Sequence, residues 1–247
     1  MNLVVDGLLL SYEQIGNGPD LVILHGWGRS GAEWCDVAAK YASTHRVTIL
    51  DLPGFGGSEI GYEAYDIYGY SEIVGHALGK LDIEHCVMLG HSLGGRIATI
   101  LASKYPKFVE ELILVDSSGV EKKSPFVQFK RFLVTIGKMI GLHRILPRSV
   151  KNILASSDYT QASPAMRKTF ANIVDADLTH LFPTITSPTL VIWGNKDAVL
   201  SVQYTKIYRK LVPDCTVHIV YDVGHSPHLE DFAQFTSVLD DWVLLHR

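Results

Sequence analysis

Short apolar runs alternate along the chain with segments in which apolar residues recur at helical spacing. The apolar runs have strand length, and they lie at Leu21–Leu24, Val47–Leu50, Cys86–Leu89, Leu112–Val115, Leu190–Trp193 and Val217–Val220. Runs of this kind are typical of strands buried on both faces of a parallel sheet. The intervening segments predict helices at Gly31–Tyr41, Ile67–Leu81, Leu93–Lys104, Val202–Leu211 and Leu229–Leu245. The alternation predicts an α/β fold, a mostly parallel sheet with helices on both faces.

Two segments depart from this alternation. The runs Leu3–Val5 and Leu8–Gln14 are joined by the dipeptide Asp6-Gly7, which is a strong signal for a two-residue hairpin. Residues 118–183 contain no convincing strand, and Phe126–Ile140 shows helical spacing. We therefore expect an antiparallel hairpin at the start of the sheet, a core domain formed by residues 1–117 and 184–247, and a helical insertion at 118–183.

Composition narrows the class of protein. The chain has 247 residues, of which 47% are hydrophobic and 19% charged, so it can bury a core of its own. No apolar stretch approaches the roughly 18 residues of a membrane span, and the first residues lack the basic start of a signal peptide. The net charge of −4 gives no reason to expect a nucleic-acid partner. Three scattered cysteines suit a reducing compartment. These features predict a soluble cytoplasmic protein with no transmembrane segment.

The segment Gly90-His91-Ser92-Leu93-Gly94 fits the pattern G-x-S-x-G between a predicted strand and a predicted helix. A nucleophilic serine on such a sharp turn needs small neighbours, because strand and helix approach each other closely there. The turn also places the hydroxyl at a helix N-terminus, where backbone N–H groups favour negative charge. We interpret Ser92 as a nucleophile, the alternative being a purely structural turn.

A serine hydroxyl needs a general base, and the base needs a group that orients it. His225 follows the last apolar run, at the sheet edge where catalytic groups of open α/β sheets gather. His228 is its nearest rival, but its place at the start of the final helix favours a packing role. Asp197 is the favoured acid, 28 residues before His225, and Asp116 at the end of the preceding strand stays open as an alternative.

Hydrolysis of an acyl bond also needs donors for the oxyanion. The turn His25–Gly28 follows the first buried strand and is expected to face Ser92, so the backbone N–H groups of Trp27 and Leu93 are the candidate donors. The side chains of Trp27, His91 and Arg96 are the candidate substrate-binding groups. For Arg96 the alternative is a salt-bridged or surface arginine on the helix.

These segments together resemble the α/β-hydrolase superfamily. The matching motifs are His25–Gly28, Asp51–Ser58, Gly90–Gly95, Trp193–Asp197 and Gly224–Glu230, in the expected order. The resemblance implies a Ser92–Asp197–His225 triad that acts without a cofactor or metal, and a helical cap, or lid, at 118–183. A serine nucleophile separates the chain from the epoxide hydrolases and haloalkane dehalogenases of this fold, which attack with aspartate.

Within the superfamily, two resemblances point to different chemistry. His25–Gly28 together with Asp51–Gly56 is similar to the esterases that demethylate a pimeloyl ester on acyl carrier protein, although His91 stands where tryptophan is expected. Ser92–Arg96 resembles the elbow of a lyase of the menaquinone pathway. We therefore predict a carboxylesterase-like serine hydrolase of esters, thioesters or lactones. A lyase or carbon–carbon bond hydrolase, or a slow-turnover ligand sensor, remains the alternative.

Charge is distributed unevenly along the chain. Between Lys122 and Lys168 there are ten basic residues and one acidic residue, so this segment carries +9 and the remainder carries −13. Such a field speeds the encounter with anionic partners. It suits an acidic carrier protein, an anionic membrane surface, or substrates with carboxylate or phosphate groups. The alternative is a lid whose basic residues only solvate its outer face.

Overall fold

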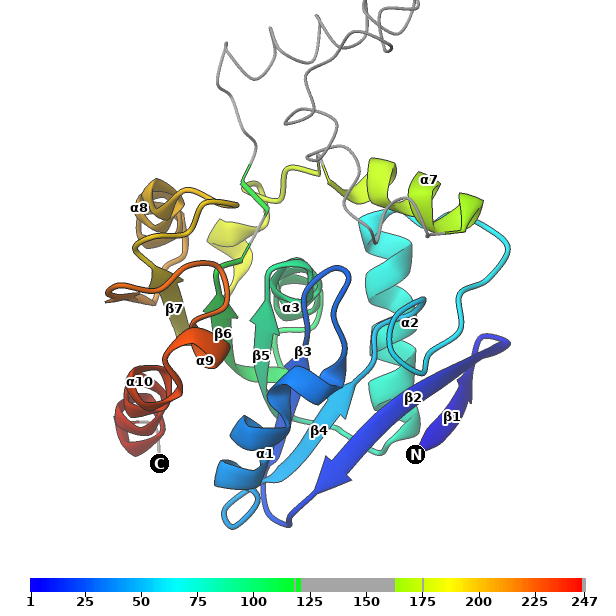
Figure 1. The fold of residues 1–247 in the computed structure, drawn as a ribbon, viewed down its shortest axis with the longest axis horizontal. Helices are drawn as coiled ribbons and strands as arrows, with labels where there is room; N and C mark the ends of the chain where they lie inside the picture. Colours follow the sequence, from blue (N-terminus) through cyan, green and yellow to red (C-terminus); the bar gives the residue numbers. More distant parts are fainter. Residues whose placement is uncertain (118, 121–162, 175, 246–247) are drawn as a thin grey trace, which may run out of the picture.

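The computed structural model describes residues 1–117, 119–120, 163–174 and 176–245. Its strands form one sheet in the order β1-β2-β4-β3-β5-β6-β7-β8 (Figure 1). The strands are β1 (Asn2–Val5), β2 (Leu8–Ile15), β3 (Asp20–Leu24), β4 (Arg46–Leu50), β5 (Cys86–His91), β6 (Val109–Val115), β7 (Thr189–Gly194) and β8 (Cys215–Val220). From β4 to β8 every neighbouring pair is parallel, and β2 is antiparallel to both β1 and β4. The predicted α/β fold is confirmed.

The sheet opens with the predicted hairpin. Val5 pairs with Leu8, so Asp6 and Gly7 form a two-residue turn. Both turn residues have positive φ, 51° for Asp6 and 80° for Gly7. Two successive residues with positive φ characterise the hairpin turn whose twist matches the strands, and Asp-Gly tolerates it.

Helices cover both faces of the sheet (Figure 1). The 3₁₀ turn η1 (Gly31–Trp34) with α1 (Cys35–Tyr41) and α10 (Phe232–Leu245) packs on one face, where Trp34 and Phe235 are fully buried. The other face carries α2 (Ile67–Lys80), α3 (Leu93–Lys104) and α8 (Thr205–Leu211), which 3₁₀ turn η4 (Val202–Tyr204) precedes. The short helix α9 (Pro227–Glu230) precedes α10. Two apolar layers therefore hold the sheet between them.

Two expectations need correction. The predicted helix 229–245 is two helices, since α9 ends at Glu230 and Asp231 accepts a hydrogen bond from the backbone N–H of Gln234 at the start of α10 (2.9 Å). The run 217–220 is not buried on both faces, because residues of β8 alternate between half-buried and exposed up to Val220. Its position explains this pattern: β8 is an edge strand that pairs only with β7.

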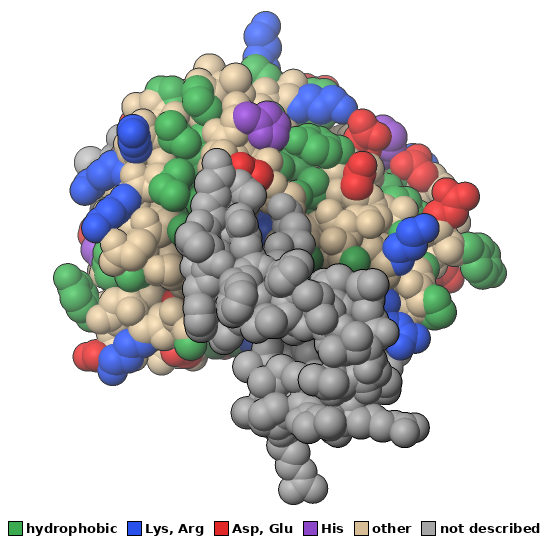
Figure 2. Space-filling model, turned by 90° about the horizontal axis from the view of Figure 1, so that it is seen from above, with side chains coloured by type: hydrophobic (Ala, Val, Ile, Leu, Met, Phe, Trp, Pro, Cys, Tyr) green, Lys and Arg blue, Asp and Glu red, His purple; other side chains and the backbone are tan. Residues whose placement is uncertain are grey.

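Part of the predicted insertion lies within the described residues. It contains α7 (Pro164–Ile173), which lies beyond the carboxyl ends of the strands (Figure 1). The 3₁₀ turn η3 (Phe182–Thr184) begins within the predicted insertion and ends one residue beyond it. The predicted helix 126–140 and most of the basic residues of 122–168 lie outside the described residues. On the described surface seen from this edge, Lys and Arg side chains are interspersed with Asp and Glu (Figure 2). None of the helices in the described ranges has the length and apolar character that crossing a bilayer requires.

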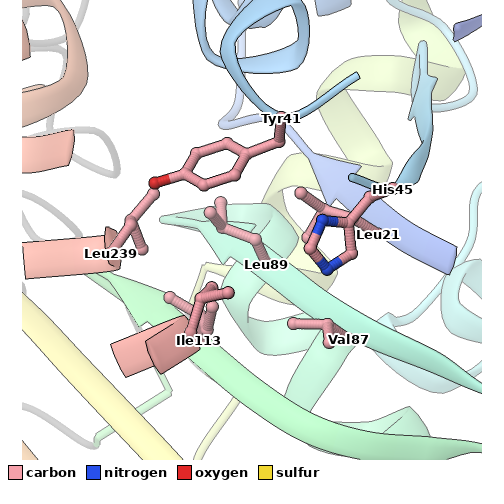
Figure 3. Close-up of a pocket in the computed structure, with 8 residues that line it drawn as sticks. Leu21, Tyr41, His45, Val87, Leu89, Ile113 and Leu239 are labelled. Carbon is pink, nitrogen blue, oxygen red and sulfur yellow. The ribbon is translucent and has the colours of Figure 1, made fainter. Parts of the chain in front are cut away.

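A small cavity lies in the apolar layer between the sheet and helices α1 and α10 (Figure 3). Its volume is about 10 Å³, and its lining residues are Leu21, Tyr41, His45, Val87, Leu89, Ile113, Leu239 and Val243. A space of this size holds about one water molecule. It is a packing gap within the core, remote from the sheet edge that carries Ser92, and it is too small for a substrate.

Candidate active site

Ser92 lies on the turn between β5 and α3, with φ 52° and ψ −105°. A positive φ is costly for a residue other than glycine, so close packing must hold this turn in place. The neighbouring glycines show how close the packing is. A Cβ atom added to Gly94 would collide with the backbone carbonyl of Leu24, and one added to Gly90 would collide with the backbone of Gly94. The sequence pattern around Ser92 therefore has the backbone geometry of a nucleophile elbow.

Three stretches that are far apart in sequence meet at this edge of the sheet. The hydroxyl of Ser92 lies 3.1 Å from Nε2 of His225, which stands on the loop between β8 and α9. Nδ1 of the same ring lies 2.8 Å from Oδ2 of Asp197, on the loop after β7. Asp197 accepts from the imidazole, so Nδ1 carries the hydrogen, and Nε2 of a neutral ring accepts from the Ser92 hydroxyl. The structure thus brings the predicted serine, histidine and aspartate together in one hydrogen-bonded chain.

The second oxygen of Asp197 is held by the backbone. Its Oδ1 accepts hydrogen bonds from the N–H groups of Val199 (2.7 Å) and Leu200 (2.9 Å). Burial raises the pKa of Asp197, but the hydrogen bonds from His225 and from Leu200 outweigh it, and the net pKa lies below the usual value. Asp197 is therefore an oriented and ionised carboxylate.

The alternative acid, Asp116, follows β6 and is fully buried. Its Oδ1 accepts a hydrogen bond from the backbone N–H of Gly194 (3.1 Å). Burial, and then the charge of Asp197, raises its pKa to about 9. Of the two candidate acids, Asp197 is the one whose carboxylate is hydrogen-bonded to His225.

The turn after β3 lies against Ser92, as the oxyanion-hole prediction requires. A Cβ atom on Gly26 would stand 3.4 Å from the Cβ of Ser92, and the carbonyl of His25 accepts a hydrogen bond from the N–H of Gly94 (3.1 Å). Within the described ranges, the backbone N–H groups of Trp27 and Leu93 have no hydrogen-bond acceptor. Two unsatisfied donors beside the serine suit an oxyanion, and their role there stays a prediction.

Trp27 belongs to an aromatic cluster that sequence reasoning missed. Its ring centroid lies 4.8 Å from that of Phe55 and 4.8 Å from that of Phe170 on α7. Phe55 lies in the motif Asp51–Ser58, which offered a signal. No spacing in the sequence connects Phe170 with Trp27, because the contact depends on where α7 docks.

His91 lies within the core beside the serine. The residue is 1% exposed, and its Nε2 donates to the backbone carbonyl of His225 (2.7 Å). The ring of His228 stacks on Trp34 with 3.9 Å between centroids, in agreement with its expected packing role. His91 thus contacts the loop of the candidate base, and a contact with substrate stays a prediction.

Arg96 is 93% buried on α3, and its guanidinium donates to the backbone carbonyls of Ile173 and Val174 (3.1 Å to Val174). These are the last carbonyls of α7, where a cation is favourable because they lack helical partners. In this structure Arg96 attaches α7 to the helix that follows the serine. Its predicted contact with substrate remains untested.

One group of three described side chains could approach a metal ion. Single ligand atoms of Asp116, Asp197 and His225 lie within 4.8 Å of one another. In this structure Nδ1 of His225 and Oδ2 of Asp197 lie 2.8 Å apart and are hydrogen-bonded to each other.

Comparison with known proteins agrees with the fold. A model of the alpha/beta hydrolase family matches residues 21–238, and the chain belongs to that family. It is 28% identical to a pimeloyl-[acyl-carrier protein] methyl ester esterase of Aeromonas hydrophila, covering 95% of this chain and 99% of the relative. It is 30% identical to an uncharacterized protein of Mycobacterium bovis, covering 96% and 78%. The crystal structure of a membrane phospholipase A described as a bacterial virulence factor superposes with a TM-score of 0.81 at 25% identity, covering 98% and 84%.

Proposed function

We propose that this protein is a serine hydrolase of carboxylic esters, or of related thioesters or lactones, that works through an acyl-enzyme on Ser92. The observation that carries the proposal is the continuous hydrogen-bonded chain from Ser92 through His225 to Asp197. The esterase relative supports an ester bond as the target. The proposed steps call for no metal and no cofactor.

The chemistry follows from the positions of these groups. The Oγ of Ser92 attacks the carbonyl carbon while Nε2 of His225 takes the hydroxyl proton, and Asp197 stabilises the imidazolium through Nδ1. The N–H groups of Trp27 and Leu93 hold the oxyanion. Collapse of the tetrahedral intermediate transfers the proton to the leaving alcohol. Water, deprotonated by His225, then hydrolyses the acyl-enzyme and regenerates the Ser92 hydroxyl.

We further propose that residues 118–183 form a cap on a core of residues 1–117 and 184–247. Support comes from α7, which packs Phe170 against Trp27 at the turn that abuts Ser92. Met166 of the same helix lies against Gly54, where an added Cβ would stand 2.6 Å from its sulfur. An aromatic wall of Trp27, Phe55 and Phe170 beside the serine suits an apolar acyl or alkyl group.

The test is turnover of p-nitrophenyl esters from acetate to palmitate. Ser92→Ala should abolish turnover with the fold intact, and Ser103→Ala, at a half-buried position near the far end of the same helix, should leave it unchanged. A fluorophosphonate should label Ser92 in the unmodified protein and label nothing in Ser92→Ala. Retained turnover in Ser92→Ala would refute the proposal. Inertness toward all esters with Arg96 essential for another reaction would favour a lyase or carbon–carbon bond hydrolase, and one acylation without turnover would favour a sensor.

We also propose that the substrate is anionic or is carried by an acidic protein in the cytoplasm. Support comes from the +9 charge between residues 122 and 168, and from the relative named for an acyl-carrier-protein substrate. All three cysteines are unpaired, which suits a reducing compartment. Reversing the charges of Lys130, Arg131 and Lys138 should slow hydrolysis of a carrier-linked ester and spare a small neutral ester. Equal effects on both esters would remove this part of the proposal.

A further inference from the structure

Asp116 is a buried carboxyl group for which the proposed reaction has no use. It follows β6 with a φ of 40°, and its side chain is fully buried. Its Oδ1 accepts one hydrogen bond, from Gly194, whereas its Oδ2 has no hydrogen-bond partner among the described residues. One oxygen of Asp116 lies within 4.8 Å of an oxygen of Asp197 and of a ring nitrogen of His225.

Two carboxyl groups this close together, away from water, do not both ionise at neutral pH, so the pair binds one proton. The donors around the pair decide which group carries it. Asp197 accepts from two backbone N–H groups and from His225, and each of these bonds favours its ionised form. Among the described residues, the carboxyl group of Asp116 accepts a hydrogen bond from Gly194 alone. The proton therefore belongs to Asp116.

Burial and the other charged groups that face Asp116 also favour its protonated form. Burial is the main cause of its raised pKa, the charge of Asp197 adds to it, and the carboxylate of Glu230 on α9 raises it further. The N–H of Gly194 acts in the opposite direction but is outweighed. A hydroxyl on Oδ2 satisfies this otherwise unpaired atom, and Asp197 has one lone pair left to accept it.

Building on the proposed roles of Asp197 and His225, we propose that Asp116 is a positioning residue that stays protonated at neutral pH and donates its hydroxyl to Asp197. The hydroxyl gives Asp197 a fourth donor and fixes its carboxylate toward His225. It also keeps a second negative charge away from the imidazole until the medium becomes alkaline.

The first test is independent of activity and uses the linkage between stability and pH. A carboxyl that is ionised in the unfolded chain above about pH 4 and protonated in the folded protein up to about pH 9 takes up one proton on folding. The wild-type protein should therefore lose stability relative to Asp116→Asn as pH rises through this range. The Tm of Asp116→Asn minus the Tm of the wild type should therefore increase steadily from about pH 5 to about pH 8.

Asp82→Asn is the matched control, because Asp82 also has a left-handed backbone (φ 52°) but faces solvent. It measures how much the loss of one surface carboxyl group alters Tm over the same pH range. A Tm difference for Asp116→Asn that stays constant would overturn the inference. If Asp116→Asn does not fold, infrared spectroscopy of the wild type decides the question: a protonated carboxyl band at neutral pH supports the inference, and its absence overturns it.

The second test uses ester turnover. Asparagine keeps a neutral donor to Asp197, so Asp116→Asn should reduce kcat only about threefold, whereas Asp116→Ala should reduce it about 10- to 100-fold with KM nearly unchanged. The wild-type activity should change near pH 9, and this step should be absent from Asp116→Asn. An identical alkaline profile in both proteins would overturn the inference. Activity in Ser92→Ala would instead overturn the proposed function and leave the Tm result standing.

Discussion

The imidazole of His91 donates from Nε2 to the backbone carbonyl of His225, at 2.7 Å. A carbonyl only accepts, so the hydrogen lies on Nε2. Burial holds the pKa of His91 well below its usual value, and the nearby imidazoles of His228 and His225 lower it further. A neutral ring next to the elbow thus holds the loop of the candidate base. This bond links the residue before Ser92 to the residue that is proposed to deprotonate it.

Substitution of His91 should therefore affect turnover more than binding. His91→Phe retains the ring volume but removes the donor, so the loop of His225 loses an anchor and kcat should fall about tenfold. KM should change little. His91→Gln keeps an N–H donor and should recover most of the lost kcat. Steady-state kinetics on one ester measure both constants. A rise in KM with kcat unchanged would show instead that His91 binds substrate.

The glycines of the elbow allow a direct test of packing. A Cβ atom at Gly94 would meet the carbonyls of Leu24 and His25, which are backbone atoms that cannot rotate away. Gly94→Ala should lower the free energy of unfolding by about 3 kcal/mol or more. Gly79→Ala is the control, because nothing lies within 4 Å of its added Cβ near the end of α2, and it should raise stability by about 0.5–1 kcal/mol. Urea denaturation measures both values, and similar losses in the two variants would contradict this explanation.

The sequence predicted the central sheet and the meeting of Ser92, Asp197 and His225, because both follow from local pattern. Apolar runs define buried strands, and residues just after parallel strands converge on one sheet edge. The exposed alternation of β8 was missed, since the sequence does not say which strand lies at the edge. The contacts of Phe170 and of Arg96 depend on how α7 docks on the core. No local pattern encodes that docking.

The protonation state of Asp116 could not be predicted from the sequence, which indicated Asp116 only as an alternative to Asp197. Its state depends on how many donors face each of two carboxyl groups. The difference between the two acids comes from backbone N–H groups, those of Val199 and Leu200 on one side and of Gly194 on the other. Backbone donors cannot be assigned from residue types alone.

Buried histidines should make the fold sensitive to mild acid. Burial lowers the pKa of His25, His91 and His228, so the folded protein keeps them neutral below about pH 6.5, where the unfolded chain binds protons. The unfolded state then binds more protons, and the free energy of unfolding falls as pH falls, by about 1.4 kcal/mol per pH unit for each histidine. Asp116 acts in the opposite direction, because it takes up a proton on folding. It therefore cancels the contribution of one of the three histidines to this pH dependence.

The measurement is the free energy of unfolding by urea between about pH 6.5 and pH 5. As pH falls, the free energy of unfolding of the wild type should decrease with a slope that corresponds to the binding of up to about two protons by the unfolded chain. His228→Phe keeps a ring on Trp34 and removes one titrating group, so its slope should be smaller by about one proton. Stability that is independent of pH over this range would contradict the assignment of neutral buried imidazoles.

Arg96 should control how α7 is attached to the core. Its guanidinium holds the carbonyls of Ile173 and Val174, and the hydrogen bonds of a buried charged group contribute about 1.5–3 kcal/mol each. Arg96→Met keeps the length of the side chain but removes these bonds, so α7 should open locally more often. Because α7 holds Phe170 against Trp27, the apolar wall beside Ser92 should loosen as well. Amide hydrogen exchange should accelerate in α7, and KM for long-chain esters should rise more than kcat falls.

Arg209→Met is the control, since Arg209 lies exposed in the last turn of α8. It should alter neither exchange in α7 nor the kinetic constants. The same experiment distinguishes the two possible roles of Arg96, contact with the substrate and attachment of α7. Loss of kcat with normal exchange in α7 would mean that the guanidinium acts on the substrate, as the lyase-like resemblance of Ser92–Arg96 suggests. Faster exchange together with a raised KM would mean that it acts through α7, because a docking residue changes the wall that the substrate meets and leaves the hydrogen-bonded chain of Ser92 intact.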